Sequence, residues 1–199
     1  MISAVVLAAG LASRMGRPKQ LLRLGGETLV RRAVATALAA PVDEVVVVIG
    51  SAADQVQAEL RTLPVRLVLN PRYAEGMATS LRAGVQALAP DSEAVVILLA
   101  DQPLLRPEVV AALVERYRAD RPPLVVPTYA GQRGNPVLFA RALYPELLEA
   151  QGDAGARAIV ARHLHEAAVV SFEDARLQTD VDTWEEYQAL KAALERPGA

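Results

Sequence analysis

The residues best suited to chemistry lie in one short stretch, residues 4–24. An apolar run there ends at Ala8-Ala9-Gly10, which predicts a buried strand and a tight turn, because small side chains let backbone amides approach a ligand. Arg14 offers a planar set of donors and Lys19 a compact, mobile charge, so together they could hold a triphosphate. The stretch contains neither a P-loop nor a G-x-G-x-x-G pattern, so a different phosphate-binding loop is expected.

A solvated basic loop after a first strand would have a similar sequence, so Arg14 and Lys19 alone leave both interpretations open. One feature of composition favours the ligand-binding interpretation. Lys19 and Lys191 are the only lysines in a chain that otherwise uses arginine. A lysine in this loop indicates a need for a small, flexible ammonium. The indication is weak, because Lys191 lies on an expected helix surface.

Other candidate residues lie at the ends of predicted elements. Asp101 follows the apolar run 94–100, and open α/β sheets bind ligands at the carboxyl ends of such strands. Ser80 lies near the start of a helix that follows a proline-containing loop, where exposed amides favour a hydrogen-bonding ligand. Asp182 precedes the last helix. Plain N-capping is the alternative interpretation for both Ser80 and Asp182.

The elements that must position these residues alternate along the chain. Continuous β-branched runs such as 44–49 are typical of strands buried on both faces of a parallel sheet. Strands separated by helices predict a doubly wound α/β sheet with helices on both faces. Besides the first strand, we expect strands at 44–49, 65–69, 94–100, 124–127, 136–139 and 167–170. We expect helices at 29–39, 54–60, 107–118, 141–149, 154–162 and 184–195, and one more that has Ser80 near its start and lasts to about residue 88.

Composition bounds the function further. The 199 residues are 52% hydrophobic, which is enough for one domain with a real core. The net charge of −2 gives no basic face, so a nucleic-acid partner is not expected. The absence of cysteine excludes disulfides and thiolate catalysis. No apolar run is long enough for a bilayer and no export signal is evident, so we expect a cytoplasmic protein with no membrane partner.

The pattern L-A-A-G-x-x-x-R-M-G-x-x-K at residues 7–19 resembles the signature of the MobA-like nucleotidyltransferase superfamily, and most closely its molybdenum cofactor cytidylyltransferase branch. Later segments match as well, so the resemblance extends over nearly the whole chain. It implies a single MobA-like NTP transferase domain over residues 1–199. The implied fold is a Rossmann-like three-layer α/β/α arrangement with a mostly parallel, mixed sheet, of the nucleotide-diphospho-sugar transferase type.

The resemblance also implies the roles of the candidate residues. D-Q-P at Asp101 and D-x-D-T at Asp182 are similar to the two metal-binding segments of the family, with Asp180 as an alternative ligand. The implied cofactor is Mg²⁺, which is often bound by one or two carboxylates plus phosphates and waters. Arg14, Lys19 and Asp101 are the implied catalytic residues. The implied nucleotide-binding residues are Leu7, Ala8, Ala9, Gly10, Arg14, Lys19, Gly76, Ser80 and Asp101.

Two glycine-bearing segments resemble the acceptor side of the family. Residues 131–136 are similar to its R-G-H-P segment, with Asn135 where histidine is usual, and residues 152–157 match its G-D-x-G-A-R segment. A further departure is Trp184, where the family has proline. The implied acceptor-binding residues are Gly134, Asn135, Asp153 and Arg157.

The resemblance implies transfer of CMP from CTP to the phosphate of a molybdopterin-type cofactor, with release of pyrophosphate and a molybdenum hydroxylase apoenzyme as a candidate recipient. Guanylyl relatives resemble L-A-G-G, with glycine at the position of Ala9. A guanylyltransferase, a cytidylyltransferase for another phosphorylated acceptor and a non-catalytic cofactor carrier remain alternatives. We expect a monomer or weak oligomer.

Overall fold

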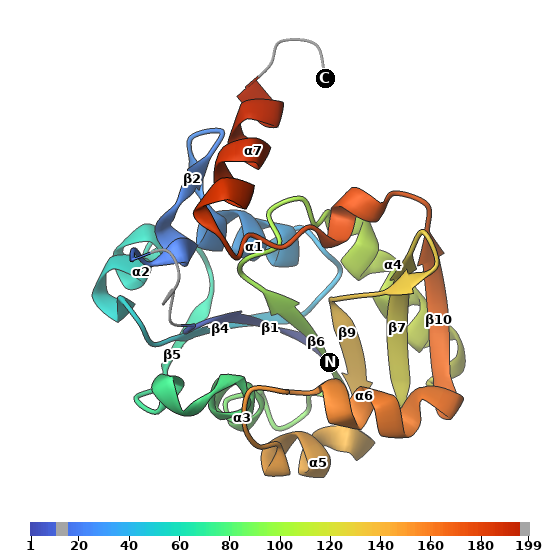
Figure 1. Ribbon diagram of the computed structural model, residues 1–199. Coiled ribbons are helices and arrows are strands. Elements are labelled where there is room, and N and C mark those ends of the chain that lie inside the picture. Colours follow the sequence, from blue (N-terminus) through green and yellow to red (C-terminus); the bar gives the residue numbers. More distant parts are fainter. Residues whose placement is uncertain (11–15, 196–199) are drawn as a thin grey trace.

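A mixed β-sheet forms the middle layer of the computed structural model, which describes residues 1–10 and 16–195 (Figure 1). The strands lie in the order β10, β7, β9, β6, β1, β4, β5, and β8 pairs with β7. Their bounds are β1 (Ile2–Ala8), β4 (Glu44–Ile49), β5 (Arg66–Leu69), β6 (Ala94–Leu99), β7 (Leu124–Tyr129), β8 (Gln132–Arg133), β9 (Val137–Ala140) and β10 (Ala167–Phe172).

Most neighbouring strands run parallel. β1 pairs in parallel with both β4 and β6, β4 with β5, and β7 with β10. The later strand β9 runs antiparallel to β6 and to β7, and this makes the sheet mixed. The predicted fold class, a three-layer α/β/α arrangement around a mostly parallel mixed sheet, is confirmed.

Helices cover both faces of the sheet. One core cluster contains side chains of α1 (Leu29–Leu38), α2 (Ala53–Leu60) and α4 (Pro107–Asp120), and the cluster on the opposite face contains those of α3 (Met77–Gln86), α5 (Tyr144–Glu149) and α6 (Arg157–His163). Strand β4 contributes alternate residues to each cluster, as a strand buried on both faces must. The continuous apolar runs of the sequence are therefore explained by burial on two sides.

A small third cluster attaches the C-terminal helix α7 (Trp184–Glu195) to a hairpin of β2 (Arg23–Leu24) and β3 (Glu27–Thr28). Both residues of the hairpin turn, Gly25 and Gly26, have positive φ, at 59° and 88°, which suits glycine. The Tyr187 hydroxyl donates to the Arg23 carbonyl at 2.8 Å. Figure 1 shows α7 standing beside this hairpin, clear of the sheet. The hairpin is therefore the platform on which the C-terminal helix docks.

The differences from the predicted elements are local. The hairpin of β2 and β3 was not among the predicted elements. Helix α6 begins at Arg157 rather than at residue 154, because Gly152 and Gly155 have φ of 67° and 53° and hold the preceding segment in turns. Within the described ranges, none of the helices is both long and apolar enough to cross a membrane.

The packing of α3 on the sheet leads to a test of the fold. A methyl group at Gly84 would lie 2.5 Å from Val5 Cγ1 and 3.1 Å from Val48 Cγ2. We expect Gly84→Ala to lower the free energy of unfolding by about 1–2 kcal/mol, because overpacking outweighs the gain in helix propensity. Urea denaturation measures this, with the exposed α3 substitution Gln86→Ala as a control near zero. A more stable Gly84→Ala protein would contradict the packing described here.

Candidate active site

The carboxyl ends of β1 and β6 meet at one edge of the sheet, where a cavity of about 400 Å³ opens. The two strands are in parallel register, with Leu7 opposite Leu99, and the Ala100 amide donates to the Leu7 carbonyl at 3.2 Å. We call the cavity at this edge the first cavity. It is lined by Leu7, Ala8, Ala9, Gly10, Lys19, Gln20, Tyr73, Ala74, Gly76, Met77, Ser80, Leu99, Ala100, Asp101 and Asp153.

Most of the predicted nucleotide-binding residues lie around this first cavity. They come from four separate parts of the chain: the end of β1 with the two residues after it, the short 3-10 helix Lys19–Leu21, the start of α3 and the end of β6. Arg14, which was predicted to hold phosphate with Lys19, lies outside the described residues. Asp182 does not line the cavity but reaches its rim through Lys19. The residues brought together are Leu7, Ala8, Ala9, Gly10, Lys19, Gly76, Ser80 and Asp101.

Lys19 lies between two carboxylates. Its ammonium donates to Asp101 Oδ2 at 2.7 Å and to Asp182 Oδ1 at 2.9 Å. The side chains of Lys19 and Asp101 are each 20% exposed, whereas that of Asp182 is 51% exposed. Burial by itself would lower the pKa of Lys19, but the charges and hydrogen bonds of Asp101 and Asp182 outweigh burial and raise it. The ammonium therefore stays charged at neutral pH.

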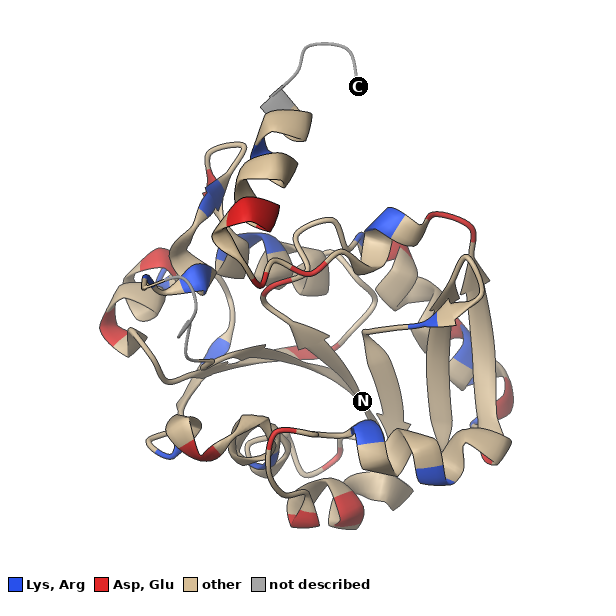
Figure 2. Cartoon of the chain, in the orientation of Figure 1, with Lys and Arg blue, Asp and Glu red and all other residues tan. Residues whose placement is uncertain are grey.

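The segment that carries Asp182 is fixed from both sides. The amide of Val181, a fully buried residue, donates to the Asp101 carbonyl at 3.0 Å. After it, Glu186 Oε2 accepts the amides of Asp182 and Thr183 at 2.8 and 2.9 Å, which caps the start of α7. Figure 2 shows acidic residues at the end of β6 and in the segment leading into α7 lying beside one another. Asp182 thus both precedes a capped helix and faces Lys19.

The two carboxylates fit a divalent cation. Asp101 Oδ1 is buried and accepts no hydrogen bond in the described part of the chain, although a buried carboxylate oxygen normally has a partner. Mg²⁺ is often held by one or two carboxylates together with phosphate oxygens and waters. No group of three or more histidine or acidic side chains in residues 1–10 and 16–195 is arranged for a metal. Any cation here would depend on oxygens of the substrate.

Gln20 is a site residue that the sequence reasoning missed. It is buried, and its amide nitrogen lies 3.1–3.3 Å from the carbonyls of Ala8, Gly10 and Ser51. These contacts connect the Lys19 turn to the loops that follow β1 and β4. A glutamine directly beside Lys19 and before two leucines is an available signal, because a buried amide needs polar partners.

The other end of the first cavity is closely packed. A methyl group on Gly50 would lie 2.7 Å from Tyr73 Cβ and 2.9 Å from Ala9 Cβ, so Tyr73 and Ala9 approach because residue 50 has no side chain. Gly76 has a φ of 110°, and a methyl group on it would lie 2.7 Å from Asp153 Oδ1. The Gly76 turn therefore packs directly against the 152–153 turn.

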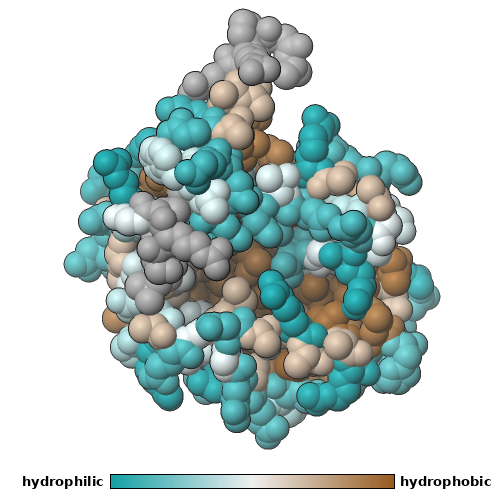
Figure 3. All heavy atoms as spheres, viewed as in Figure 1, coloured by the Kyte–Doolittle hydropathy of each residue, from teal (hydrophilic) through white to brown (hydrophobic). Residues whose placement is uncertain are grey.

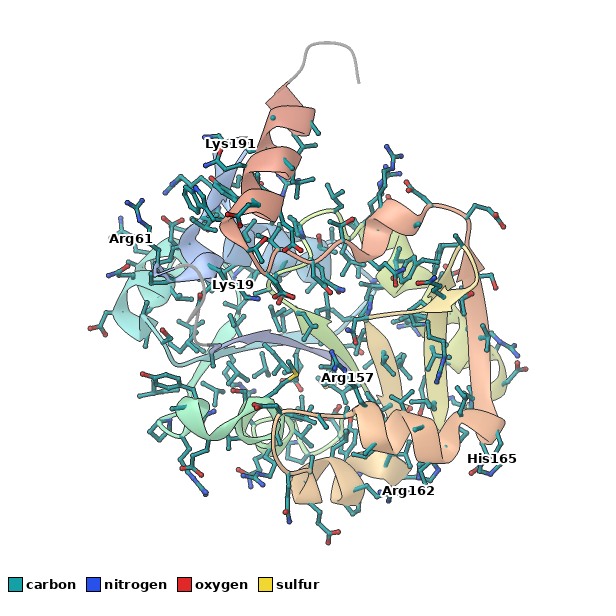
Figure 4. All side chains as sticks on the ribbon, in the orientation of Figure 1. Lys19, Arg61, Arg157, Arg162, His165 and Lys191 are labelled. Carbon is teal, nitrogen blue, oxygen red and sulfur yellow. The ribbon has the colours of Figure 1, made fainter. Side chains whose placement is uncertain are left out.

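A second cavity of about 480 Å³ shares Leu7, Met77 and Leu99 with the first. Its walls include Leu81, Ile97, Val137, Phe139 and Val160, while Arg133, Asn135, Arg157 and Asp180 are among its polar residues. Figure 3 shows apolar surface across the middle of this face, bordered by hydrophilic side chains. Figure 4 shows Lys19 and Arg157 on different sides of this central region.

The predicted acceptor residues divide between the two cavities. Gly134, Asn135 and Arg157 line the second cavity, whereas Asp153 lines the first. The acceptor-binding role of all four residues stays a prediction.

Gln102 and Asp180 lie where the acidic segment meets the second cavity. Gln102 is buried, and its amide nitrogen donates to Asp180 Oδ1 at 2.9 Å. Withdrawal from water raises the pKa of Asp180; the Gln102 hydrogen bond opposes this rise, and the charges of Asp101 and Asp182 add to it. The predicted alternative acid therefore faces a different cavity from Asp101.

Comparisons with known proteins relate this geometry to a family. Residues 4–168 match the MobA-like NTP transferase domain. The nicotine blue oxidoreductase of Paenarthrobacter nicotinovorans is 33% identical over 198 residues, covering 95% of this chain and 96% of the relative. The purine catabolism protein PucB of Bacillus subtilis (strain 168) is 31% identical over 199 residues, covering 96% of each chain.

Solved structures are similar over nearly the whole chain as well. Rv0371c from Mycobacterium tuberculosis H37Rv has a TM-score of 0.86 at 31% identity, covering 96% of this chain and 97% of that chain. The complex of Rv0371c with manganese has a TM-score of 0.84 at 29% identity, covering 96% of this chain and 98% of that chain. The family match ends at residue 168, so a single domain spanning residues 1–199 stays a prediction.

The ion pairs of Lys19 lead to a stability test. Lys19→Met keeps an unbranched stem but leaves Asp101 and Asp182 facing each other without a cation. We expect the free energy of unfolding at pH 7 to fall by about 1–3 kcal/mol. Adding Asp101→Asn to Lys19→Met should restore part of this loss, because one uncompensated charge is removed.

Urea denaturation at pH 7 compares these proteins with Arg61→Met as a control. Arg61 is exposed and has no ion-pair partner among the described residues, so its removal should change stability by less than about 0.5 kcal/mol. If Lys19→Met were as stable as wild type, the two ion pairs would contribute nothing to the fold.

Proposed function

The chain belongs to the MobA-like NTP transferase family, as residues 7–19 predicted, and it is a nucleotidyltransferase; from this premise we propose that it transfers CMP from CTP to a molybdopterin-type cofactor. A phosphate oxygen of the acceptor attacks the α-phosphorus of CTP. The bond from that phosphorus to the bridging oxygen breaks, and pyrophosphate leaves with the electron pair. The product is a cytosine dinucleotide form of the cofactor.

The observation that carries this proposal is the position of Lys19 and two carboxylates at the rim of one cavity that shares walls with another. Nucleotidyl transfer needs a positioned nucleophile and a neutralised triphosphate, and it needs no covalent enzyme intermediate. The first cavity suits a nucleotide, and the second suits the acceptor. Leu7, Met77 and Leu99, which line both cavities, mark where the two substrates would meet.

The charged residues take different roles in this scheme. Lys19 and Arg14 hold the triphosphate and stabilise the leaving pyrophosphate. Asp101 and Asp182 would hold Mg²⁺, which supplies positive charge next to the phosphates. The manganese complex of the relative Rv0371c supports a divalent cation for this chain. The buried, unpartnered Asp101 Oδ1 supports it independently.

The second cavity has the chemistry that a flat, phosphorylated ring system requires. Apolar side chains such as Ile97, Val137 and Phe139 offer a surface for the ring, and Arg133 and Arg157 can bind phosphate. Asn135 and Asp180 supply polar partners for ring nitrogens and carbonyls. These features support a molybdopterin-type acceptor.

The names of the relatives do not all describe transfer. From the nicotine blue oxidoreductase we infer kinship only, because this chain has no cysteine and no G-x-G-x-x-G pattern. A guanylyltransferase and a non-catalytic cofactor carrier are the alternatives. The charged group of Lys19, Asp101 and Asp182 favours catalysis over carriage, since a carrier has no need of a leaving-group site.

Pyrophosphate release tests the proposal. CTP, GTP, ATP and UTP are each incubated with the protein and Mg²⁺, with and without molybdenum-loaded molybdopterin. We expect release with CTP that depends on the acceptor. Release with GTP alone would identify a guanylyltransferase, and binding of the cofactor without release from any nucleotide would identify a carrier.

The role of Asp101 gives a sharper prediction. Asp101→Asn keeps the shape of the side chain but removes a cation-ligand charge, so we expect turnover to be abolished while the fold survives. Asp91→Asn is the matched control, since Asp91 lies on an exposed turn that lines neither cavity. A tenfold loss of activity corresponds to ~1.4 kcal/mol of lost transition-state stabilisation. If Asp101→Asn kept more than about a tenth of the activity at saturating Mg²⁺, a metal role for Asp101 would be ruled out.

Base preference depends on Ala9. This residue is buried and lines the first cavity. We infer that its methyl group takes space that a purine would need. We expect wild type to prefer CTP over GTP. Ala9→Gly should lower the ratio of kcat/KM for CTP to kcat/KM for GTP by roughly ten- to two-hundred-fold at most, because one methyl group is worth only about 1–3 kcal/mol. An unchanged ratio, or a wild type that prefers GTP, would contradict cytidylyl transfer.

A further inference from the structure

A buried asparagine outside the predicted site connects the end of β4, the turn after β5 and the start of α3, where Ser80 lines the first cavity. Asn70 follows β5, is 4% exposed, and its own amide donates to the Ile49 carbonyl at 2.8 Å. Its side-chain nitrogen donates to Thr79 Oγ1 at 2.8 Å and to Ser80 Oγ at 3.0 Å. Its side-chain oxygen accepts the Arg72 amide at 2.9 Å. Every polar group of this side chain is therefore used, and its orientation is fixed.

The two hydroxyls that accept from Asn70 differ in what they do with their own protons. Thr79 donates within the protein, because the carbonyls of Arg72 and Gly76 each lie 2.9 Å from its oxygen. Ser80 has no acceptor among the described residues, although it is only 6% exposed and lines the first cavity. Since Asn70 occupies one lone pair of the Ser80 oxygen, the Ser80 proton remains available to a ligand in the cavity.

We propose that Asn70 is a positioning residue for base recognition: by donating to Ser80 it directs the Ser80 hydroxyl proton into the first cavity, which then requires a hydrogen-bond acceptor on the nucleobase. This inference rests on the proposed function, because it assumes that a nucleotide occupies the first cavity. Cytosine presents O2 and N3 as acceptors and satisfies the requirement. A base edge that presented a donor there would leave two protons facing each other in a buried site.

Reversing the polarity of residue 70 tests this arrangement. Asn70→Asp keeps the size of the side chain, but a carboxylate only accepts hydrogen bonds. The Ser80 proton would then turn toward residue 70, and a lone pair would face the cavity in its place. The Arg72 amide could still donate to the carboxylate. Ser80→Ala removes the hydroxyl altogether and leaves no lone pair.

Calorimetric titration of the full chain at pH 8 with Mg²⁺ measures Kd for CTP and for inorganic tripolyphosphate, which has no base. The ratio of Kd for tripolyphosphate to Kd for CTP isolates the contribution of the nucleoside. We expect Ser80→Ala to reduce this ratio about ten-fold, the value of one hydrogen bond of about 1.4 kcal/mol. Asn70→Asp should reduce it further, because an acceptor then faces an acceptor. The double variant Asn70→Asp/Ser80→Ala should return to the Ser80→Ala value.

Return of the double variant to the Kd ratio of Ser80→Ala would show that Asn70 acts through Ser80. If Asn70 had only a structural role, the double variant would bind CTP worse than either single variant. Thr79→Val is the matched control: it loses the neighbouring contact to Asn70, and we expect lower thermal stability with an unchanged Kd ratio. Should Asn70→Asp not fold, a wild-type ratio in Ser80→Ala would still overturn the inference. A wild-type chain that binds tripolyphosphate and CTP equally well would instead contradict the proposed nucleotide site.

Discussion

The contact of one ammonium with two carboxylates is the interaction on which the site depends. Lys19, Asp101 and Asp182 come from a short 3-10 helix (Lys19–Leu21), the end of β6 and the segment before α7, and the Lys19 ammonium meets the two carboxylates at 2.7 and 2.9 Å. Without the Lys19 ammonium between them, the carboxylates of Asp101 and Asp182 would repel each other in a partly buried position. The arrangement therefore requires that all three segments reach the same edge of the sheet. The parallel pairing of β1 with β6 puts their carboxyl ends side by side, and Gln20 connects the Lys19 helix to the Ala8 carbonyl there.

The third segment is brought there by apolar packing away from the site. Val181 and Tyr187 are buried with Leu22, Leu24 and Leu29, so the C-terminal helix is attached to the hairpin directly after Lys19. Because the Val181 amide also bonds to the Asp101 carbonyl, Asp182 has little freedom to move relative to the other two residues. The hairpin and α7 add nothing to the main sheet. Their position is explained by the need to hold the acidic segment over Lys19.

Local patterns predicted much of this molecule, and long-range partners account for what was missed. The 44–49 strand and the last helix, 184–195, were predicted with the bounds that the structure shows, because burial on two faces and helix capping leave clear local signals. Sequence alone did not bring Asp101 and Asp182 together; the family resemblance did. Gln20 and Asn70 were missed, since their partners are carbonyls and hydroxyls on other segments. Composition does not record which buried amides meet which acceptors.

The first cavity has different physical chemistry at its two ends. At the Lys19 end the contacts are ionic, and such contacts attract any triphosphate, because charge attraction depends little on the identity of the base. At the Ser80 end the contacts are neutral hydrogen bonds between buried side chains, held in place by Asn70 and the Gly76 turn. There the direction of a hydrogen bond decides whether a polar group has a partner. Under the proposed function, triphosphate affinity depends on the Lys19 end and base choice on the Ser80 end. The Lys19 ion pairs and the hydrogen bonds of the Asn70 side chain share no residue. Changes at one end should therefore combine additively with changes at the other.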